Sequence, residues 1–242
     1  GYLHRYLQLF PDEPHANLQM ANLMLEDTRY AAQREQAAEA CYAALAKLPV
    51  DQRPPLRAKL GQVLIDLQRY AAARQEAETL ASEASHLSGD ARATALAEAA
   101  RLAALAAYGR AMIAGRDDRT PGEPSLVERF QKALQQKPSD VAMATILARV
   151  YRQQTHLLDE EQRAADPAEL AALADQIIDR MVARNPEGVD ALLARAGYRA
   201  AYDIAGAEDD LHEAFRREPA NLQVRLAAAD FYRREALGAQ RR

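Results

Sequence analysis

The chain has 242 residues, of which 49% are apolar and 27% are charged, so it can bury a core and stay in solution. Its formal net charge of −4 at pH 7 gives no overall basic field and argues against a nucleic-acid-binding protein. Alanine fills 54 positions and tryptophan none, so strong helix formers outnumber the residues that strands favour. These features exclude an all-β fold and a parallel sheet.

The single cysteine, Cys41, excludes an intrachain disulfide and a multi-cysteine metal site. No stretch reaches the roughly 18 consecutive apolar residues of a membrane span, so we expect no membrane contact by this segment. The chain begins with Gly1 in what reads as mid-helix sequence, which predicts a fragment of a longer protein. The compartment stays open: a cytoplasmic segment is favoured, and a membrane-tethered parent protein is the alternative.

Prolines divide the chain into repeated segments. Small residues stand ten positions after four of them: Ala21, Ala148, Ala196 and Ala229. Apolar residues stand eight positions before five prolines: Leu3, Cys41, Phe130, Ile178 and Leu211. Because proline cannot continue a helical hydrogen-bond ladder, each of these prolines is predicted to end a helix. The polar residues that follow are expected to turn the chain and to cap the next helix.

Apolar residues at three- and four-residue spacing predict twelve helices, each with one buried stripe. Their approximate spans are 1–10, 14–28, 32–47, 54–68, 70–87, 90–115, 125–137, 140–156, 166–184, 188–203, 205–217 and 220–237. Asp166 and Pro167 have the pattern of an N-cap followed by a first-turn proline. Gly61 lies inside a predicted helix at a cost of ~1 kcal/mol against alanine, which suggests that another helix packs closely there.

Each unit is therefore a helix, a tight turn and an antiparallel helix, repeated along an axis. We predict one all-α array over residues 1–242, with units at about 1–13, 14–51, 52–89, 90–139, 140–187, 188–220 and 221–242. The last helix has an apolar side without a partner, which predicts further repeats in the parent protein. The open ends are also candidates for self-association of the isolated segment.

This pattern resembles the tetratricopeptide repeat (TPR), and looks like the degenerate type in large bacterial multi-repeat proteins. The residues that carry the resemblance are Leu60, Gly61, Arg69, Tyr70 and Ala73 in one unit, Leu147, Ala148, Tyr151, Ala174, Ile178 and Pro186 in another, and Ala207, Leu211, Ala214 and Pro219 in a third. The early tryptophan of the family is absent, and the units lengthen at 111–125 and 154–166. The resemblance implies an α-solenoid, a right-handed superhelix whose first helices line a concave groove. It also implies binding of a protein or an extended peptide, without catalysis.

The resemblance further implies which side chains face that groove: those one, four and five positions after the small residue of each first helix. The residues selected in this way are Asn22, Gln62, Ile65, Asp66, Arg149, Arg152, Gln153, Asp230, Arg233 and Arg234. Asparagine and arginine side chains there could hold the backbone of an extended peptide or an acidic side chain. The alternative is an ordinary solvated surface, and binding by the convex face also stays open.

No residue pattern indicates catalysis, a cofactor or a metal site. His156 lies near Asp159, Glu160 and Glu161, but a solvated helix end is favoured over a metal site. Cys41 falls on a buried stripe and is interpreted as a small hydrophobe rather than a nucleophile. The acidic pairs are interpreted as solvated turns and exposed helix starts: Asp117 with Asp118, Glu160 with Glu161, and Asp209 with Asp210.

The favoured function is a non-catalytic scaffold that binds a protein or an extended peptide, with no nucleic acid as partner. The first alternative is a structural spacer or assembly arm of a larger, membrane-tethered or soluble, multi-repeat protein. Further alternatives are a sensor for a small ligand or an RNA segment, and an accessory module of an enzyme encoded outside this segment.

Overall fold

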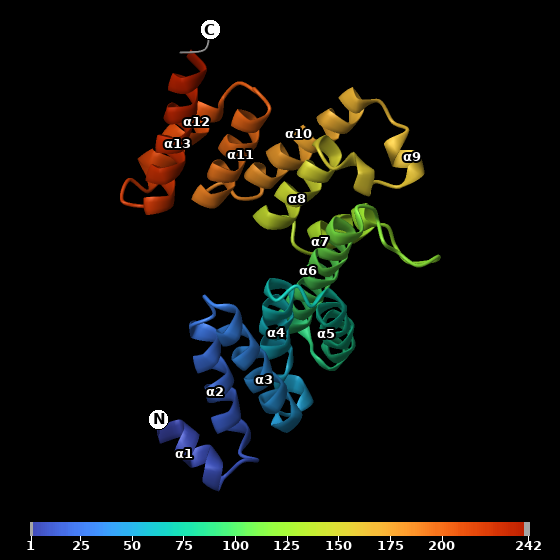
Figure 1. Cartoon of the computed structure of the whole chain (residues 1–242), viewed down its shortest axis with the longest axis vertical. Coiled ribbons are helices and arrows are strands. Elements are labelled where there is room, and N and C mark those ends of the chain that lie inside the picture. Colours follow the sequence, from blue (N-terminus) through green and yellow to red (C-terminus); the bar gives the residue numbers. More distant parts are fainter. Residues whose placement is uncertain (1, 240–242) are drawn as a thin grey trace. The chain divides into compact units, whose positions relative to one another are not determined.

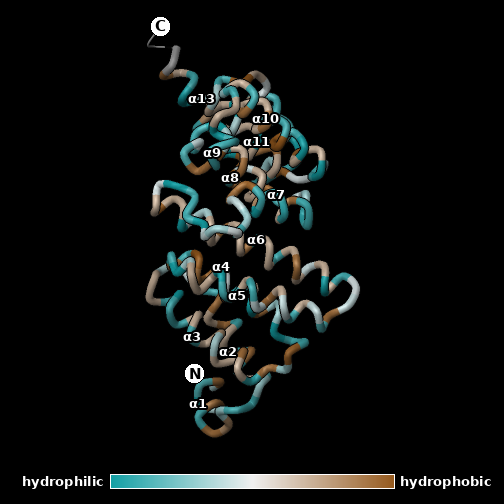
Figure 2. Tube along the Cα trace, turned by 90° about the vertical axis from the view of Figure 1, so that its right-hand side faces the viewer, coloured by the Kyte–Doolittle hydropathy of each residue, from teal (hydrophilic) through white to brown (hydrophobic). Residues whose placement is uncertain are grey.

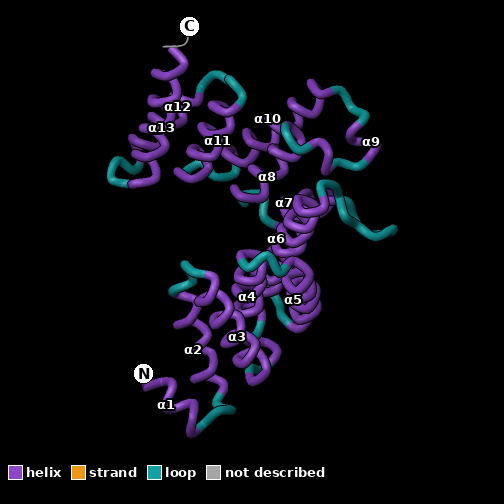
Figure 3. Tube along the Cα trace, viewed as in Figure 1, coloured by secondary structure: helices purple, strands orange, loops and turns teal. Residues whose placement is uncertain are grey.

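The computed structural model describes residues 2–239. Over that range the chain forms thirteen α-helices and three short 3₁₀ helices without a strand (Figure 3). The α-helices are α1 (Tyr2–Leu9), α2 (Pro14–Glu26), α3 (Ala31–Lys47), α4 (Pro54–Asp66), α5 (Tyr70–Glu83), α6 (Gly89–Ala114), α7 (Leu126–Gln136), α8 (Val141–Arg152), α9 (Glu160–Arg163), α10 (Pro167–Ala183), α11 (Val189–Ala201), α12 (Ala207–Arg217) and α13 (Leu222–Ala239). The all-α prediction is confirmed, and each of the twelve predicted helices is present. Only α9, a single turn in the lengthened stretch 154–166, was not predicted.

Prolines set the helix boundaries as the sequence predicts. Helices α1, α3, α7 and α12 each end two residues before a proline, and α2, α8, α11 and α13 each begin three residues after one. Asp140 caps α8 by accepting a hydrogen bond from the Met143 backbone N–H at 3.0 Å. Asp166 caps α10 in the same way, through the Ala168 N–H at 2.8 Å. These carboxylates satisfy backbone donors that have no partner within the helix.

The chain separates into two compact units, each described by itself (Figure 1). The first unit contains α1 to α7 together with residues His156–Asp159, and the second contains α8 to α13. Along every helix of both units, apolar and polar residues alternate at short intervals (Figure 2). That alternation gives each helix one stripe to bury and one to expose. The prediction of one continuous array stays a prediction.

In the first unit, each helix from α1 to α7 packs against the next one along the chain, and α4 also packs against α6. The core around α2, α3 and α4 is made of small and medium side chains, among them Ala21, Ala44 and Leu60. A polar cluster joins α4 to α5: Arg57 donates to Glu83 at 2.8 and 2.9 Å and also pairs with Glu76. All three side chains of this cluster are buried.

Two glycines let helices of the first unit approach one another closely. A Cβ atom on Gly61 of α4 would lie 2.5 Å from a methyl carbon of Leu102 in α6. A Cβ atom on Gly109 of α6 would overlap the ring of Tyr70 at the start of α5. Neither position has room for alanine unless a neighbour moves, so the predicted close contact at Gly61 is confirmed.

In the second unit, α8 pairs with α10 and α11 pairs with α12. Helix α11 also contacts both α8 and α13, which lie at its two sides. Ile178 and Leu211, two of the apolar residues that stand eight positions before a proline, are buried in this unit. On α13, Leu222 and Leu226 are 66% and 58% exposed, in agreement with the unpartnered apolar side that the sequence predicts.

The close contact at Gly61 generates a stability prediction. Substitution Gly61→Leu forces four carbon atoms into the space that Leu102 fills, and should lower the free energy of unfolding by ~1–3 kcal/mol through overpacking. Ala148→Leu, at a fully buried position of α8, should have a similar cost. Denaturant melts followed by circular dichroism measure both changes. The control is Ala46→Leu on the exposed side of α3, expected within about 0.5 kcal/mol of wild type; equal melts of all three variants would refute the close contact.

Candidate functional site

The predicted groove residues of the first unit make hydrogen bonds between α2 and α4 and between α4 and α6. Lys59 of α4 donates to the Asn22 side chain of α2 at 3.0 Å. Gln62 of α4 donates to Asp66 at 2.9 Å and accepts from Arg101 of α6 at 3.0 Å. These side chains therefore share one face of the unit, and their hydrogen bonds are made to one another.

In the second unit, Arg152 connects three helices. Its guanidinium donates to Asp175 of α10 at 2.7 Å and to the hydroxyl of Tyr198 of α11 at 2.8 Å. It also stacks over the ring of Tyr202, with Cζ 4.8 Å from the ring centroid. Burial, followed by the hydrogen bond to Asp175, raises the pKa of Tyr198, so its hydroxyl stays protonated. Arg152 thus ties α8 to α10 and α11.

The other predicted residues of the second unit are more accessible. Arg149 of α8 and Gln153, which follows the last residue of α8, are exposed, and neither side chain has a hydrogen-bond or ion-pair partner among residues 2–239. Arg233 of α13 pairs with Asp230 on the same helix at 2.9 Å. Burial raises the pKa of Tyr202, and the charges of Arg149 and Arg152 partly oppose that shift.

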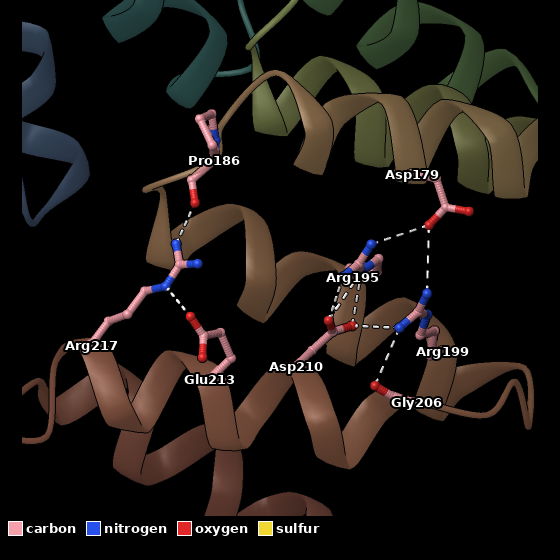
Figure 4. Close-up of polar contacts among 8 residues, drawn as sticks. All are labelled: Asp179, Pro186, Arg195, Arg199, Gly206, Asp210, Glu213 and Arg217. Atoms are coloured by element: carbon pink, nitrogen blue, oxygen red, sulfur yellow. Dashed lines mark hydrogen bonds and ion pairs between the residues drawn. The ribbon is translucent and has the colours of Figure 1, made fainter.

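Asp210 corrects one sequence interpretation, because it is buried rather than solvated. Only 4% of its side chain is exposed, and it accepts from Arg195 at 2.6 and 2.9 Å and from Arg199 at 3.0 Å. Both arginines also reach Asp179 of α10, at 3.4 and 3.6 Å (Figure 4). The Asp209–Asp210 pair lies at an α12 start that packs against α11, so two cations compensate the buried charge. This cluster joins α10, α11 and α12.

Each unit has a groove with a largely apolar lining. In the first unit, a groove of ≈ 410 Å³ runs between α5 and α7 over an alanine-rich floor on α6. Its charged rim includes Glu78, Arg129 and Lys132. In the second unit, a groove of ≈ 170 Å³ lies between α11 and α13, with Leu211 of α12 also in its lining. Gly197 and Ala200 of α11 form part of this second groove.

The candidate metal ligands and the single cysteine have the following surroundings in residues 2–239. Within that range, no three His, Cys, Asp or Glu side chains are placed to hold a metal ion together. Burial raises the pKa of the Cys41 thiol to about 12, so the thiolate nucleophile is scarce at neutral pH. The interpretation of Cys41 as a buried hydrophobe is confirmed, since its exposed fraction is 0%.

The sequence pattern selects Asn22, Gln62 and Arg152 but misses their partners. Lys59, Arg101 and Tyr198 are not one, four or five positions after the small residue of a first helix, so the pattern does not select them. Each nevertheless bonds to a predicted residue on a neighbouring helix. Their separations from those partners are 37, 39 and 46 residues, which is about one repeat. Polar residues separated by one repeat length were the signal that could have found them.

Two comparisons and one membrane criterion complete the description of the site. The chain gives no match to models of known protein families and no match to curated protein sequences. In the part of the chain that the structure describes, no helix combines the length and the apolar character needed to cross a membrane.

The buried Asp210 generates a second stability prediction. Substitution Asp210→Ala leaves Arg195 and Arg199 without their shared carboxylate, and should lower the free energy of unfolding by about 3 kcal/mol. Thermal or urea melts measure the loss. The matched control is Asp209→Ala, an exposed neighbour in the first turn of α12, which should change stability by less than about 0.5 kcal/mol. Equal effects of the two substitutions would contradict the cluster.

The raised pKa of Cys41 generates a labelling prediction. Iodoacetamide at pH 8 should leave the folded protein unmodified and should label it fully in guanidinium chloride, as read by intact mass. An unfolded thiol ionises near 8.5. Its folded-state pKa is higher, so the stability that the buried neutral thiol contributes is complete below pH 8.5 and declines as the pH rises above it. Rapid labelling of the folded chain would contradict the burial.

Proposed function

We propose that this chain is a TPR-like helical-repeat scaffold that binds an extended segment of a partner protein. In this proposal, antiparallel helix pairs of each unit stack in the sense of a right-handed superhelix. The first helices, α2, α4 and α6 in one unit and α8, α11 and α13 in the other, present the binding face. The proposal assigns no reaction to the chain.

One observation carries this proposal: first helices of successive pairs contact one another directly and are joined by side chains. Lys59 bonds Asn22, Arg101 bonds Gln62, and Arg152 bonds Tyr198, each across two first helices of the same unit. Residues at matching positions of successive repeats therefore lie in a row on one face. Repeat proteins use such rows to bind extended chains.

The second unit is the better candidate for the binding face. In the first unit, the polar side chains of the row are engaged with one another, so few of their donors and acceptors are left for a partner. In the second unit, Arg149 and Gln153 are exposed and make no side-chain contact with another polar group of residues 2–239. An arginine or glutamine in this state can bond to a peptide backbone or a carboxylate without breaking an existing contact.

A structural spacer is the second candidate function, and the bonded row of the first unit favours it. A face whose polar groups are mutually satisfied adds stiffness between helix pairs but offers little for recognition. The two roles are compatible if the first unit sets a distance and the second unit binds.

Site-specific photo-crosslinking tests the proposal. A benzophenone amino acid at Gln153, directly after α8, should capture a partner from native lysate as a discrete band that excess unlabelled protein competes away. The same amino acid at Ala172, an exposed position of α10, serves as the control and should capture none. Capture at Ala172 but not at Gln153 would refute the first-helix face, and no competed capture at either would favour the spacer.

A further inference from the structure

Gly197 in the middle of α11 has no explanation within the packing of the protein. A glycine inside a helix costs ~1 kcal/mol of stability relative to alanine. Gly61 and Gly109 also lie inside helices, but a Cβ atom at either would collide with Leu102 or Tyr70. A Cβ atom at Gly197 would meet no atom of its surroundings within 4 Å, and the residue is exposed. The reason for a glycine at position 197 therefore lies outside the protein's own packing.

Gly197 opens onto the groove between α11 and α13. Leu193, Ala196 and Ala200 line it from α11, Leu211 from α12, and Ala227 and Phe231 from α13. The groove has a volume of ≈ 170 Å³, below the roughly 300–1,000 Å³ of sites that enclose small-molecule ligands. This size suits one aliphatic side chain of a segment that continues beyond the groove at both ends.

The uncompensated charges beside this groove are positive. Arg234 of α13 lines it and has no hydrogen-bond or ion-pair partner in residues 2–239. The carboxylate in its lining, Asp230, is already paired with Arg233 at 2.9 Å. On the other side of α11, Arg149 of α8 is also unpaired, whereas Arg152 is engaged with Asp175. Two free guanidinium groups thus flank α11, in a protein whose net charge is −4.

The spacing of these groups fits an extended chain. Packed helices lie about 8–10 Å apart, so the backbones of α8 and α13, which both contact α11, are separated by roughly 16–20 Å. An extended chain covers that distance in about five or six residues at ~3.3 Å each. A guanidinium group pairs with a carboxylate through two parallel hydrogen bonds.

We propose that the α11–α13 groove binds an extended acidic segment of a partner protein. Its backbone crosses α11 at Gly197, one aliphatic side chain enters the groove, and carboxylates about five or six residues apart pair with Arg149 and Arg234. This proposal rests on the proposed function and names the chemistry of the partner. The bare backbone of Gly197 allows the partner's backbone to approach more closely than any side chain would permit.

Selection from a random peptide library tests the chemistry of the partner. Peptides of ten residues, displayed on phage and selected on the whole chain, should converge on sequences with two acidic residues about five or six positions apart and an aliphatic residue between them. Fluorescence polarisation then compares a selected peptide with a counterpart in which glutamine replaces the acidic residues. The counterpart should bind at least about tenfold more weakly. No enrichment of acidic residues would overturn the proposal.

Variants of the chain locate the site. A Cβ atom at position 197 meets no atom within 4 Å, so Gly197→Gln should retain or raise thermal stability while it weakens binding of the selected peptide by about tenfold or more. Arg149→Ala and Arg234→Ala should each weaken binding about tenfold and reduce its salt dependence. The matched control, Ala172→Gln on α10, should bind as wild type does. A further variant combines Arg149→Ala with Arg234→Ala. If both this double variant and Gly197→Gln bind the selected peptide as tightly as wild type does, the site is refuted.

Two further outcomes separate this proposal from others. If an eight-nucleotide single-stranded RNA binds as tightly as the selected peptide and the same variants weaken it, the partner is a nucleic acid and the proposal is wrong. If Gln153 gives competed crosslinks but the selected peptides are not acidic, this inference fails and the proposed function stands. If neither crosslinks nor peptides are obtained, both fail.

Discussion

Close approach between helix backbones is the constraint on which both units depend. The core is built largely from alanine, and at Gly61 and Gly109 the neighbouring side chain occupies the space that a Cβ atom would need. Alanine buries little apolar area, so each joint gains less from the hydrophobic effect than a leucine-rich joint would. Short distances between backbones compensate in part, because they multiply the dispersion contacts between packed atoms.

Arginine clusters fix the register between packed helices, which the small side chains of the core cannot do. Arg57 joins α4 to α5, Arg152 joins α8 to α10 and α11, and Arg195 joins α11 to α10 and α12. Smooth alanine surfaces can slide against one another, whereas a guanidinium group and a buried carboxylate bond in one arrangement only. Arg57 and Arg195 each pair with a buried carboxylate, and such pairs add little net stability, but removing one partner leaves a charge without compensation.

The sequence predicts the fold further than it predicts the binding face. Prolines and apolar spacing are local signals, and they place the ends of α7 and α12 because a helix cannot continue through the proline that follows. The burial of Asp210 depends on Arg195 and Arg199, which lie on the preceding helix, and no local pattern reveals that the three meet. Likewise, the difference between the exposed Gly197 and the tightly packed Gly61 depends on helices that are distant in the sequence.

Different faces of helix α11 serve the fold and the proposed binding site. Arg195 bonds toward α10 and α12, and Tyr198 bonds toward α8 and α10. These faces of α11 are therefore occupied by contacts within the fold. Gly197 and Ala200 occupy the remaining direction, toward the groove with α13. Stability alone would place alanine at position 197. The chain instead leaves a bare backbone between two free cations, which is the arrangement that an external acidic segment would complete.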